Sequence, residues 1–195
     1  MPTWFHMIAR GLQMFSALFL CALTSAANAM ELQPGSVQNL VFRDVDGNNL
    51  ATADGHVTVI TVVTRENETK ARAVADLVPE RYVGDRNFRY VTLVNFQGKL
   101  FRPVHGLTRA VIRSRLEAEA KKLQPKYAAK KINRDPRGDI YVIPDFDGSA
   151  VARLGLPQQL SEIVVFVFNG KGRLVERWKG VPPGDALAKA IADAE

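Results

Sequence analysis

The chain has 195 residues, of which 26 are Lys or Arg and 20 are Asp or Glu, giving a formal net charge of +6. Its single cysteine, Cys21, excludes an internal disulfide, a dithiol redox pair and a metal site built from several cysteines. The length suits one compact domain with a sizeable hydrophobic core.

Residues 1–29 have the pattern of a secretory signal peptide. Arg10 supplies a positive charge, residues 11–23 form an apolar segment, and Ala27, Asn28 and Ala29 offer a small-x-small cleavage site. Cleavage there leaves residues 30–195 as the mature protein, which we expect in a bacterial periplasm. Because Cys21 lies in the leader, the mature protein is expected to contain no thiol.

Two other interpretations of the leader were weighed against cleavage. A lipoprotein keeps the cysteine as its lipidated first residue, but this requires a small residue before Cys21, and Leu20 stands there. A retained membrane anchor requires about 18–20 continuous apolar residues. The apolar segment is shorter and is interrupted by Gln13 and Ser16, so the sequence favours a cleaved leader.

The mature sequence begins with a hairpin, followed by a strand and a helix. Residues 39–42 predict a short strand, and residues 44–48 a tight turn. The β-branched run VTVITVV at 57–63 is typical of a strand buried on both faces. We expect a helix directly after it, with Thr64 as its N-cap.

The rest of the chain alternates predicted strands and helices. Pro125 is expected to interrupt a long helix, because proline removes a backbone hydrogen bond and clashes with the preceding turn. Helices between the first strands require parallel strand pairs, and the closing hairpin adds antiparallel strands at one edge. The pattern therefore predicts an α/β fold with a mixed central sheet. The expected strands are 88–96, 140–143, 163–168 and 173–178, and the expected helices are 108–123, a short one ending near 155, and 183–194.

Basic residues gather between Arg102 and Arg137. Such a stretch can contact nucleic acid, an anionic envelope surface or an acidic partner. Export and the lack of interleaved aromatic side chains argue against nucleic acid. We expect a solvated helix face on which Glu117 and Glu119 pair locally, with weak contact to an anionic envelope surface as the alternative. The eleven basic residues are Arg102, Arg109, Arg113, Arg115, Lys121, Lys122, Lys126, Lys130, Lys131, Arg134 and Arg137.

Two segments near the C-terminus carry a recognisable pattern. The first is PDFDGS at 144–149 with ARLGL at 152–156, and the second is VVFVFNGKGRL at 164–174 with RWKG at 177–180. Together with the predicted element order, they resemble the thioredoxin-like superfamily in its exported thiol-disulfide and peroxiredoxin-like branch. The resemblance covers about residues 39–195. It implies a thioredoxin-like three-layer sandwich for the domain 30–195, with a mixed sheet flanked by helices and an N-terminal β-hairpin.

The resemblance fails at the positions that carry the family's chemistry. In the family, a Cys-x-x-Cys pair or one peroxidatic cysteine follows the strand matched here by 57–63. Glu66 and Thr69 stand about where the two cysteines would be, and neither side chain can pass on disulfide electrons. The family's cis-proline is also missing, because residues 160–162 occupy its place without a proline.

These positions define a candidate binding rim at the degenerate active site. Glu66 and Glu68 are expected in the first turn of the helix, where its positive end favours them. Backbone N–H groups there could bind an anion with help from Arg65, although the two glutamates already supply negative charge. A self-capped helix without a ligand is the alternative. The rim consists of Thr64, Arg65, Glu66, Asn67, Thr69, Leu160, Ser161 and Glu162.

Few residues are available for a replacement chemistry. The mature chain has two histidines, His56 and His105, and we expect both to be ordinary polar loop residues. The segments DVDG at 44–47 and DFDG at 145–148 resemble calcium loops, but their glycine comes at the fourth position instead of the sixth. They are predicted to be turns. We therefore expect no catalytic residue, no metal and no cofactor.

Fold markers without catalytic residues favour a binding protein. The leading hypothesis is an exported, redox-inactive thioredoxin-like protein that acts as a binding or assembly module for a periplasmic protein partner. The alternative is a thiol-disulfide oxidoreductase or peroxidase-related enzyme that uses an external thiol. The two differ in whether the mature protein turns over disulfides or peroxide.

Overall fold

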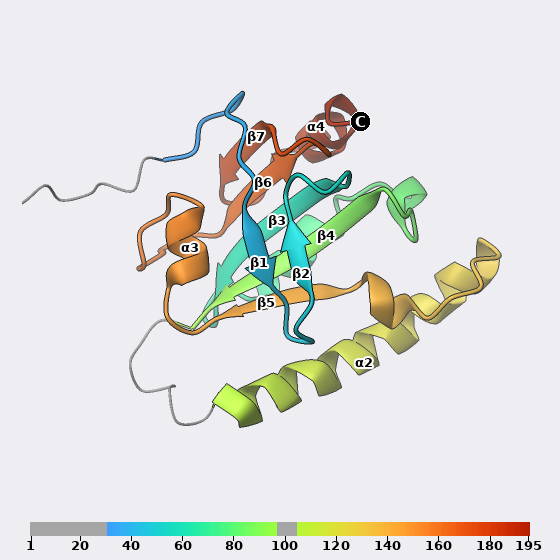
Figure 1. Ribbon diagram of the computed structural model, residues 1–195. Helices are drawn as coiled ribbons and strands as arrows, with labels where there is room; N and C mark the ends of the chain where they lie inside the picture. Colours follow the sequence, from blue (N-terminus) through green and yellow to red (C-terminus); the bar gives the residue numbers. More distant parts are fainter. Residues whose placement is uncertain (1–30, 97–104) are drawn as a thin grey trace, which may run out of the picture.

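A computed structural model describes residues 31–96 and 105–195. The expected signal peptide, Cys21 and Arg102 lie outside the described residues. A five-stranded sheet in the order β5–β4–β3–β6–β7 forms the centre of the fold (Figure 1). Its strands are β3 (Val57–Thr64), β4 (Phe88–Asn95), β5 (Tyr141–Asp145), β6 (Val164–Phe168) and β7 (Leu174–Lys179).

The pairing of these strands is mixed, as the sequence predicted. β3 pairs in parallel with β4, and β4 in parallel with β5. β3 also pairs antiparallel with β6, which pairs antiparallel with β7. All eight residues of β3 are buried, because the central strand has a neighbour on each side and a packed layer on each face. The β-branched run therefore fits the most enclosed place in the sheet.

Three helices pack on one face of the sheet. They are α1 (Thr69–Ala75), α2 (His105–Ala129) and α4 (Ala186–Asp193). Val74 of α1, Leu116 of α2 and Ile191 of α4 join one hydrophobic cluster with side chains of the sheet. Two 3-10 helices, η1 (Glu80–Tyr82) and η3 (Pro136–Asp139), precede β4 and β5.

The opposite face is covered by a hairpin and a short helix, which completes the three layers (Figure 1). The hairpin consists of β1 (Val41–Arg43) and β2 (Asn49–Ala51), and the helix is α3 (Ser149–Arg153). Phe42, Leu50 and Leu154 pack here in a second hydrophobic cluster. The predicted N-terminal hairpin and the turn at 44–48 are confirmed.

The segment before the hairpin runs along the outer edge of β7. The Gly35 N–H donates to the Leu174 carbonyl, the Leu174 N–H donates to the Ser36 carbonyl, and the Gln38 N–H donates to the Gly172 carbonyl. Val37 forms an isolated antiparallel bridge with Arg173. The last strand of the sheet is thus partly covered by the first described residues of the chain.

The predicted break at Pro125 is wrong, because α2 continues through it to Ala129. A proline inside a helix costs about 3 kcal/mol. Tertiary packing offsets that cost: Tyr127 is 1% exposed, and its hydroxyl donates to an Asp139 carboxylate oxygen. Val111 of α2 is 47% exposed, so this apolar side chain of the helix does not join the core.

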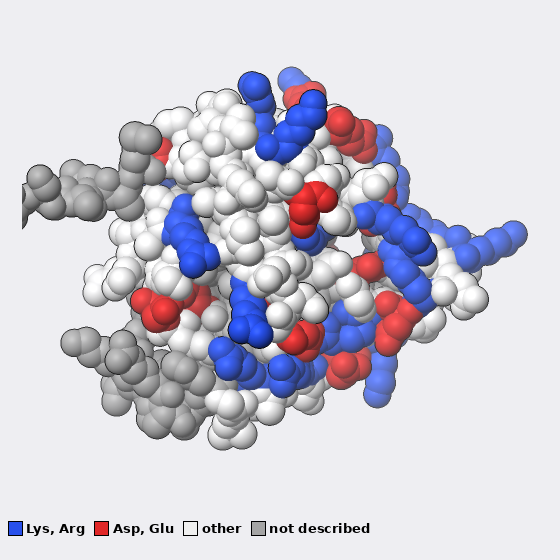
Figure 2. Space-filling model, in the orientation of Figure 1, with Lys and Arg blue, Asp and Glu red and all other residues white. Residues whose placement is uncertain are grey.

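The basic stretch lies mainly on α2, and five of its ten described members form ion pairs. Arg113 pairs with Asp46 at 3.1 Å, Lys122 with Glu119 at 2.7 Å, and Arg137 with Glu117 at 3.2 Å. The expected local pairing is present for Glu119, whereas Glu117 pairs with Arg137 of η3, outside its own helix. Figure 2 shows the basic side chains along the lower and right-hand parts of the molecule, over α2. Among the described helices, none combines the length and the apolar character needed to cross a lipid bilayer.

Candidate functional site

A row of buried polar residues marks the carboxyl ends of the three parallel strands. Thr64, Asn95 and Asp145 end β3, β4 and β5, and the strand register places them side by side. Their exposed fractions are 5%, 3% and 3%. The carboxyl end of parallel strands is where open α/β sheets usually bind ligands. The candidate rim lies at this edge.

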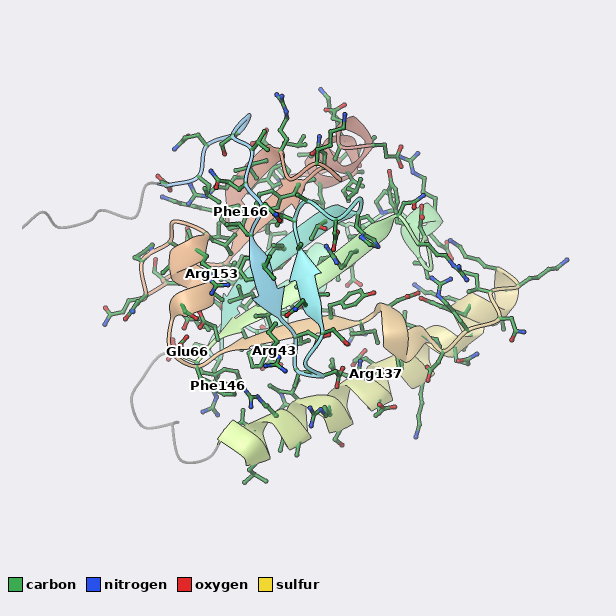
Figure 3. All side chains as sticks on the ribbon, viewed as in Figure 1. Arg43, Glu66, Arg137, Phe146, Arg153 and Phe166 are labelled. Carbon is green, nitrogen blue, oxygen red and sulfur yellow. The ribbon has the colours of Figure 1, made fainter. Side chains whose placement is uncertain are left out.

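The first half of the rim is a turn between β3 and α1. The Asn67 side-chain oxygen accepts a hydrogen bond from the Thr64 N–H at 2.7 Å, and both residues are buried. Arg65 and Glu66 project from this turn into solvent, and Figure 3 labels Glu66. Thr69 is exposed and is the first residue of α1.

This turn corrects the expected start of the helix. Thr64 is the last residue of β3 and does not cap α1, because its backbone is used in pairing with Asn95. The N-cap is Glu68, without a side-chain capping bond, and no acidic residue lies in the first turn of α1. A helix of seven residues that begins this late does not support the anion site considered at its N-terminus.

The second half of the rim precedes β6. Val164 pairs with Val62, so the preceding residues lie at the same sheet edge as the turn after β3. Leu160 packs against the core, whereas Ser161 and Glu162 are exposed. The two halves are linked across β4, because the Asn95 side-chain amide donates to the Gln158 carbonyl at 2.8 Å. The sequence analysis missed Asn95 and Gln158.

Asp145 is a buried acid at this edge. Its Oδ2 accepts a hydrogen bond from the Val151 N–H at 2.9 Å. Burial raises the pKa of Asp145, and its hydrogen bond and charge interaction with Asp147 raise it further. The pKa of Asp147 is lowered, chiefly by hydrogen bonds with Ser149. The pKa values of the two acids therefore shift in opposite directions.

Asp145→Asn is expected to stabilise the protein at neutral pH, because an amide keeps the acceptor for Val151 without a buried charge. A raised folded-state pKa means that folding favours protonated Asp145. The stability that protonated Asp145 contributes is therefore present at low pH and is lost as the pH rises through the folded-state pKa. In urea unfolding, the gain should therefore be largest near pH 7 and shrink toward about pH 4.

Asp147→Asn is the matched control. Because the folded-state pKa of Asp147 is lowered, its charged form contributes stability above its unfolded pKa, and this is lost as the pH falls. The control should thus be less stable than the parent near neutral pH and approach it on acidification. Identical pH trends for the two variants would contradict the opposite pKa shifts of Asp145 and Asp147.

His56 lies at the opposite end of the sheet, just before β3. Its Nδ1 is 2.8 Å from the Asp54 Oδ1, and both Asp54 oxygens lie 3.0 Å from the Arg89 guanidinium. This is a structural ion-pair network remote from the rim, and the sequence analysis missed Asp54 and Arg89. His105 is the first residue of α2. Among the described residues, no group of three or more His, Cys, Asp or Glu is placed to hold a metal ion.

A groove of about 560 Å³ lies beside the carboxyl end of β5. The β1–β2 hairpin, α3 and the first turns of α2 form its walls, and Arg43, Arg109, Arg113 and Arg153 line it. Figure 3 shows Arg43, Arg153 and Phe146 in this part of the molecule. The sequence analysis missed the groove, because its arginines come from separate elements and share no local motif.

The architecture is that of a thioredoxin-like fold, as the sequence pattern predicted, and solved structures with low sequence identity share it. A thiol:disulfide interchange protein of the thioredoxin family from Chlorobium tepidum TLS has a TM-score of 0.50 at 16% identity, with 84% of this chain and 98% of that chain covered. A peroxiredoxin-like protein from Aquifex aeolicus has a TM-score of 0.50 at 14% identity, with 85% and 89% covered. No family model and no curated protein matches the sequence.

Proposed function

We propose that the mature protein acts in the bacterial envelope as a thioredoxin-fold binding or assembly module, without thiol chemistry of its own. The observation that carries this proposal is the turn after β3. Glu66 and Thr69 stand at the places expected for cysteines, and Asn67 is committed to a backbone hydrogen bond. The one cysteine of the chain, Cys21, belongs to the expected signal peptide.

The rim offers a surface suited to binding. Arg65, Glu66, Thr69, Ser161 and Glu162 are exposed. The buried hydrogen bonds beneath them hold the two halves of the rim to one rigid sheet edge. A surface of charged and polar side chains on a fixed scaffold suits recognition of a protein partner through polar contacts. The fold alone does not assign a function, so the proposal depends on this site.

The rival function is thiol-disulfide or peroxide chemistry with an external thiol, as the names of the two structural neighbours suggest. Insulin-disulfide reduction and peroxide consumption should be measured with the purified protein 30–195, with and without added glutathione. We expect no turnover above the protein-free background, because the mature chain offers no thiolate. Turnover that is abolished by Glu66→Ala or Thr69→Ala would overturn the proposal.

The binding role itself is tested by crosslinking in the native envelope. Glu66→Arg should abolish the crosslinks of the parent protein, since it reverses a charge at the centre of the rim. Glu80→Arg is the matched control: Glu80 is also exposed, but it lies in η1, before the amino end of β4. Equal loss of crosslinks in both variants, or in neither, would place the partner elsewhere.

Mass spectrometry of the mature N-terminus tests cleavage after Ala29.

A further inference from the structure

We propose that the groove beside β5 binds a small molecule carrying two or more phosphate or carboxylate groups. The proposal goes beyond the function of the rim, because it concerns a different set of residues around β1, β5, α2 and α3. The volume of about 560 Å³ is in the range of small-molecule sites. Its floor contains the buried side chains of Phe42, Ile143 and Ala150.

Three of the acids that line the groove accept hydrogen bonds from backbone N–H groups of the protein itself. Asp44 accepts hydrogen bonds from the Asp46 and Asn48 N–H groups at 2.9 and 2.7 Å, which shape the turn of the hairpin. Asp145 and Asp147 accept the N–H groups of Val151 and Ser149 around the start of α3. These carboxylates fix the backbone turns that form two walls of the groove.

Asp46 is neutralised by two ion pairs. It lies 3.1 Å from the Arg113 guanidinium and 2.5 Å from the Arg137 guanidinium. Arg113 also donates to the Val45 carbonyl at 2.7 Å. These contacts tie the hairpin turn to α2, and they account for the one lining arginine that has a carboxylate partner.

The other three lining arginines have no carboxylate partner within the described part of the chain. Arg43 donates from Nε to the Gly47 carbonyl at 3.2 Å, and Arg153 donates from Nη1 to the Val41 carbonyl. The Arg109 guanidinium lies over the Phe146 ring, 5.4 Å from its centre. None of these three guanidinium groups is therefore held in an ion pair with a described carboxylate.

The identity and arrangement of these cations determine the ligand class. All three are arginines, whose planar guanidinium matches phosphate and carboxylate groups with two parallel hydrogen bonds. They reach the groove from β1, α2 and α3, three separate elements of its wall. A compact molecule with at least two such groups satisfies them together.

Isothermal titration calorimetry at about 0.1 M salt with pyrophosphate and with citrate tests the proposal. We expect saturable binding of at least one of the two. The triple variant Arg43→Gln, Arg109→Gln, Arg153→Gln should bind about tenfold more weakly or worse, because it removes charge-assisted hydrogen bonds. Should that variant not fold, Arg109→Gln alone serves, since this exposed side chain makes only a ring contact among the described interactions.

A variant with the same loss of charge provides the control. Lys121→Gln, Lys126→Gln, Lys131→Gln removes three exposed cations near the end of α2, outside the groove. Its affinity should stay within about twofold of the parent, because exposed charges far from a ligand are screened by salt. Equal weakening in both triple variants, or no saturable binding of either probe, would overturn the proposal.

Vesicles of phosphatidylglycerol distinguish a lipid headgroup from a free anion. Sedimentation with these vesicles that is lost in the arginine variant and kept in the lysine variant assigns the groove to the same phosphate chemistry on a membrane surface. Sedimentation lost only in the lysine variant, together with no binding of pyrophosphate or citrate, would contradict the groove and favour the basic stretch of α2.

Discussion

Arg89→Met is expected to lower the free energy of unfolding by about 2–4 kcal/mol. The Arg89 side chain is 5% exposed, and its guanidinium contacts both oxygens of Asp54. It also donates to the Ala51 carbonyl at 2.6 Å and to the Thr58 hydroxyl at 3.1 Å. The change leaves these acceptors without their donor and removes one of the links between the β1–β2 hairpin and the central sheet.

Urea unfolding measures this loss, and Arg72→Met is its control. Arg72 is 68% exposed and lies 4.0 Å from Glu119, so its removal should change stability by less than about 1 kcal/mol. A loss in the Arg89 variant no larger than in the control would show that the buried network contributes nothing.

The same variant carries a pH signature through Asp54. Burial opposes the charged form of Asp54, but hydrogen bonds from Arg89 and His56 outweigh it and lower its pKa. A lowered folded-state pKa means that the contribution is fully present above the unfolded pKa and is lost as the pH falls through the folded pKa. The stability difference between parent and Arg89→Met should therefore shrink below about pH 4.

Gly172→Ala is expected to destabilise the protein by about 2–4 kcal/mol, well beyond the cost of its backbone conformation alone. Gly172 has a φ of +77°, and a Cβ at this position would lie 2.4 Å from the Gln38 carbonyl oxygen. The neighbour is backbone, which cannot move without releasing the segment along β7. Chemical denaturation gives the loss, and limited proteolysis should show earlier cleavage of residues 31–38.

Gly180→Ala separates the backbone strain of a left-handed residue from the steric clash of an added Cβ with a neighbouring atom. Gly180 has a φ of +85°, but a Cβ there would meet no atom within 4 Å. This control should lose only the left-handed penalty of about 1–2 kcal/mol. Equal losses in the two variants would mean that the segment along β7 contributes nothing to stability.

The sequence predicted the sheet well, because β3 leaves little ambiguity. An uninterrupted β-branched run is typical of a strand in the centre of a sheet, and the second C-terminal segment identified β6, which pairs with it. The predicted start of α1 was wrong because the strand extends one residue further than the sequence suggested. Thr64 has the side chain of a helix cap, but pairing with Asn95 keeps it in the strand.

Other features depend on distant contacts that no local pattern reveals. The helix passes Pro125 because the burial of Tyr127, which comes after it, is worth more than one lost hydrogen bond. The groove was missed since Arg43, Arg109 and Arg153 are far apart in the chain and come together only when β1, α2 and α3 surround β5. The residues of the candidate rim lie at one edge of the sheet, because they directly follow β3 and directly precede β6.

The segment along β7 has a consequence for the order in which the chain can fold. The Ser36 carbonyl accepts a hydrogen bond from the Leu174 N–H, the Gln38 N–H donates to the Gly172 carbonyl, and β3 needs β6, about a hundred residues later in the chain. Such pairings form slowly, because the entropy cost of closing a long loop comes before any stabilising contact is made. The sheet therefore cannot be completed until most of the chain has been made. A chain emerging from the ribosome therefore lacks β6 and β7, two of the five strands of the central sheet, until late in its synthesis.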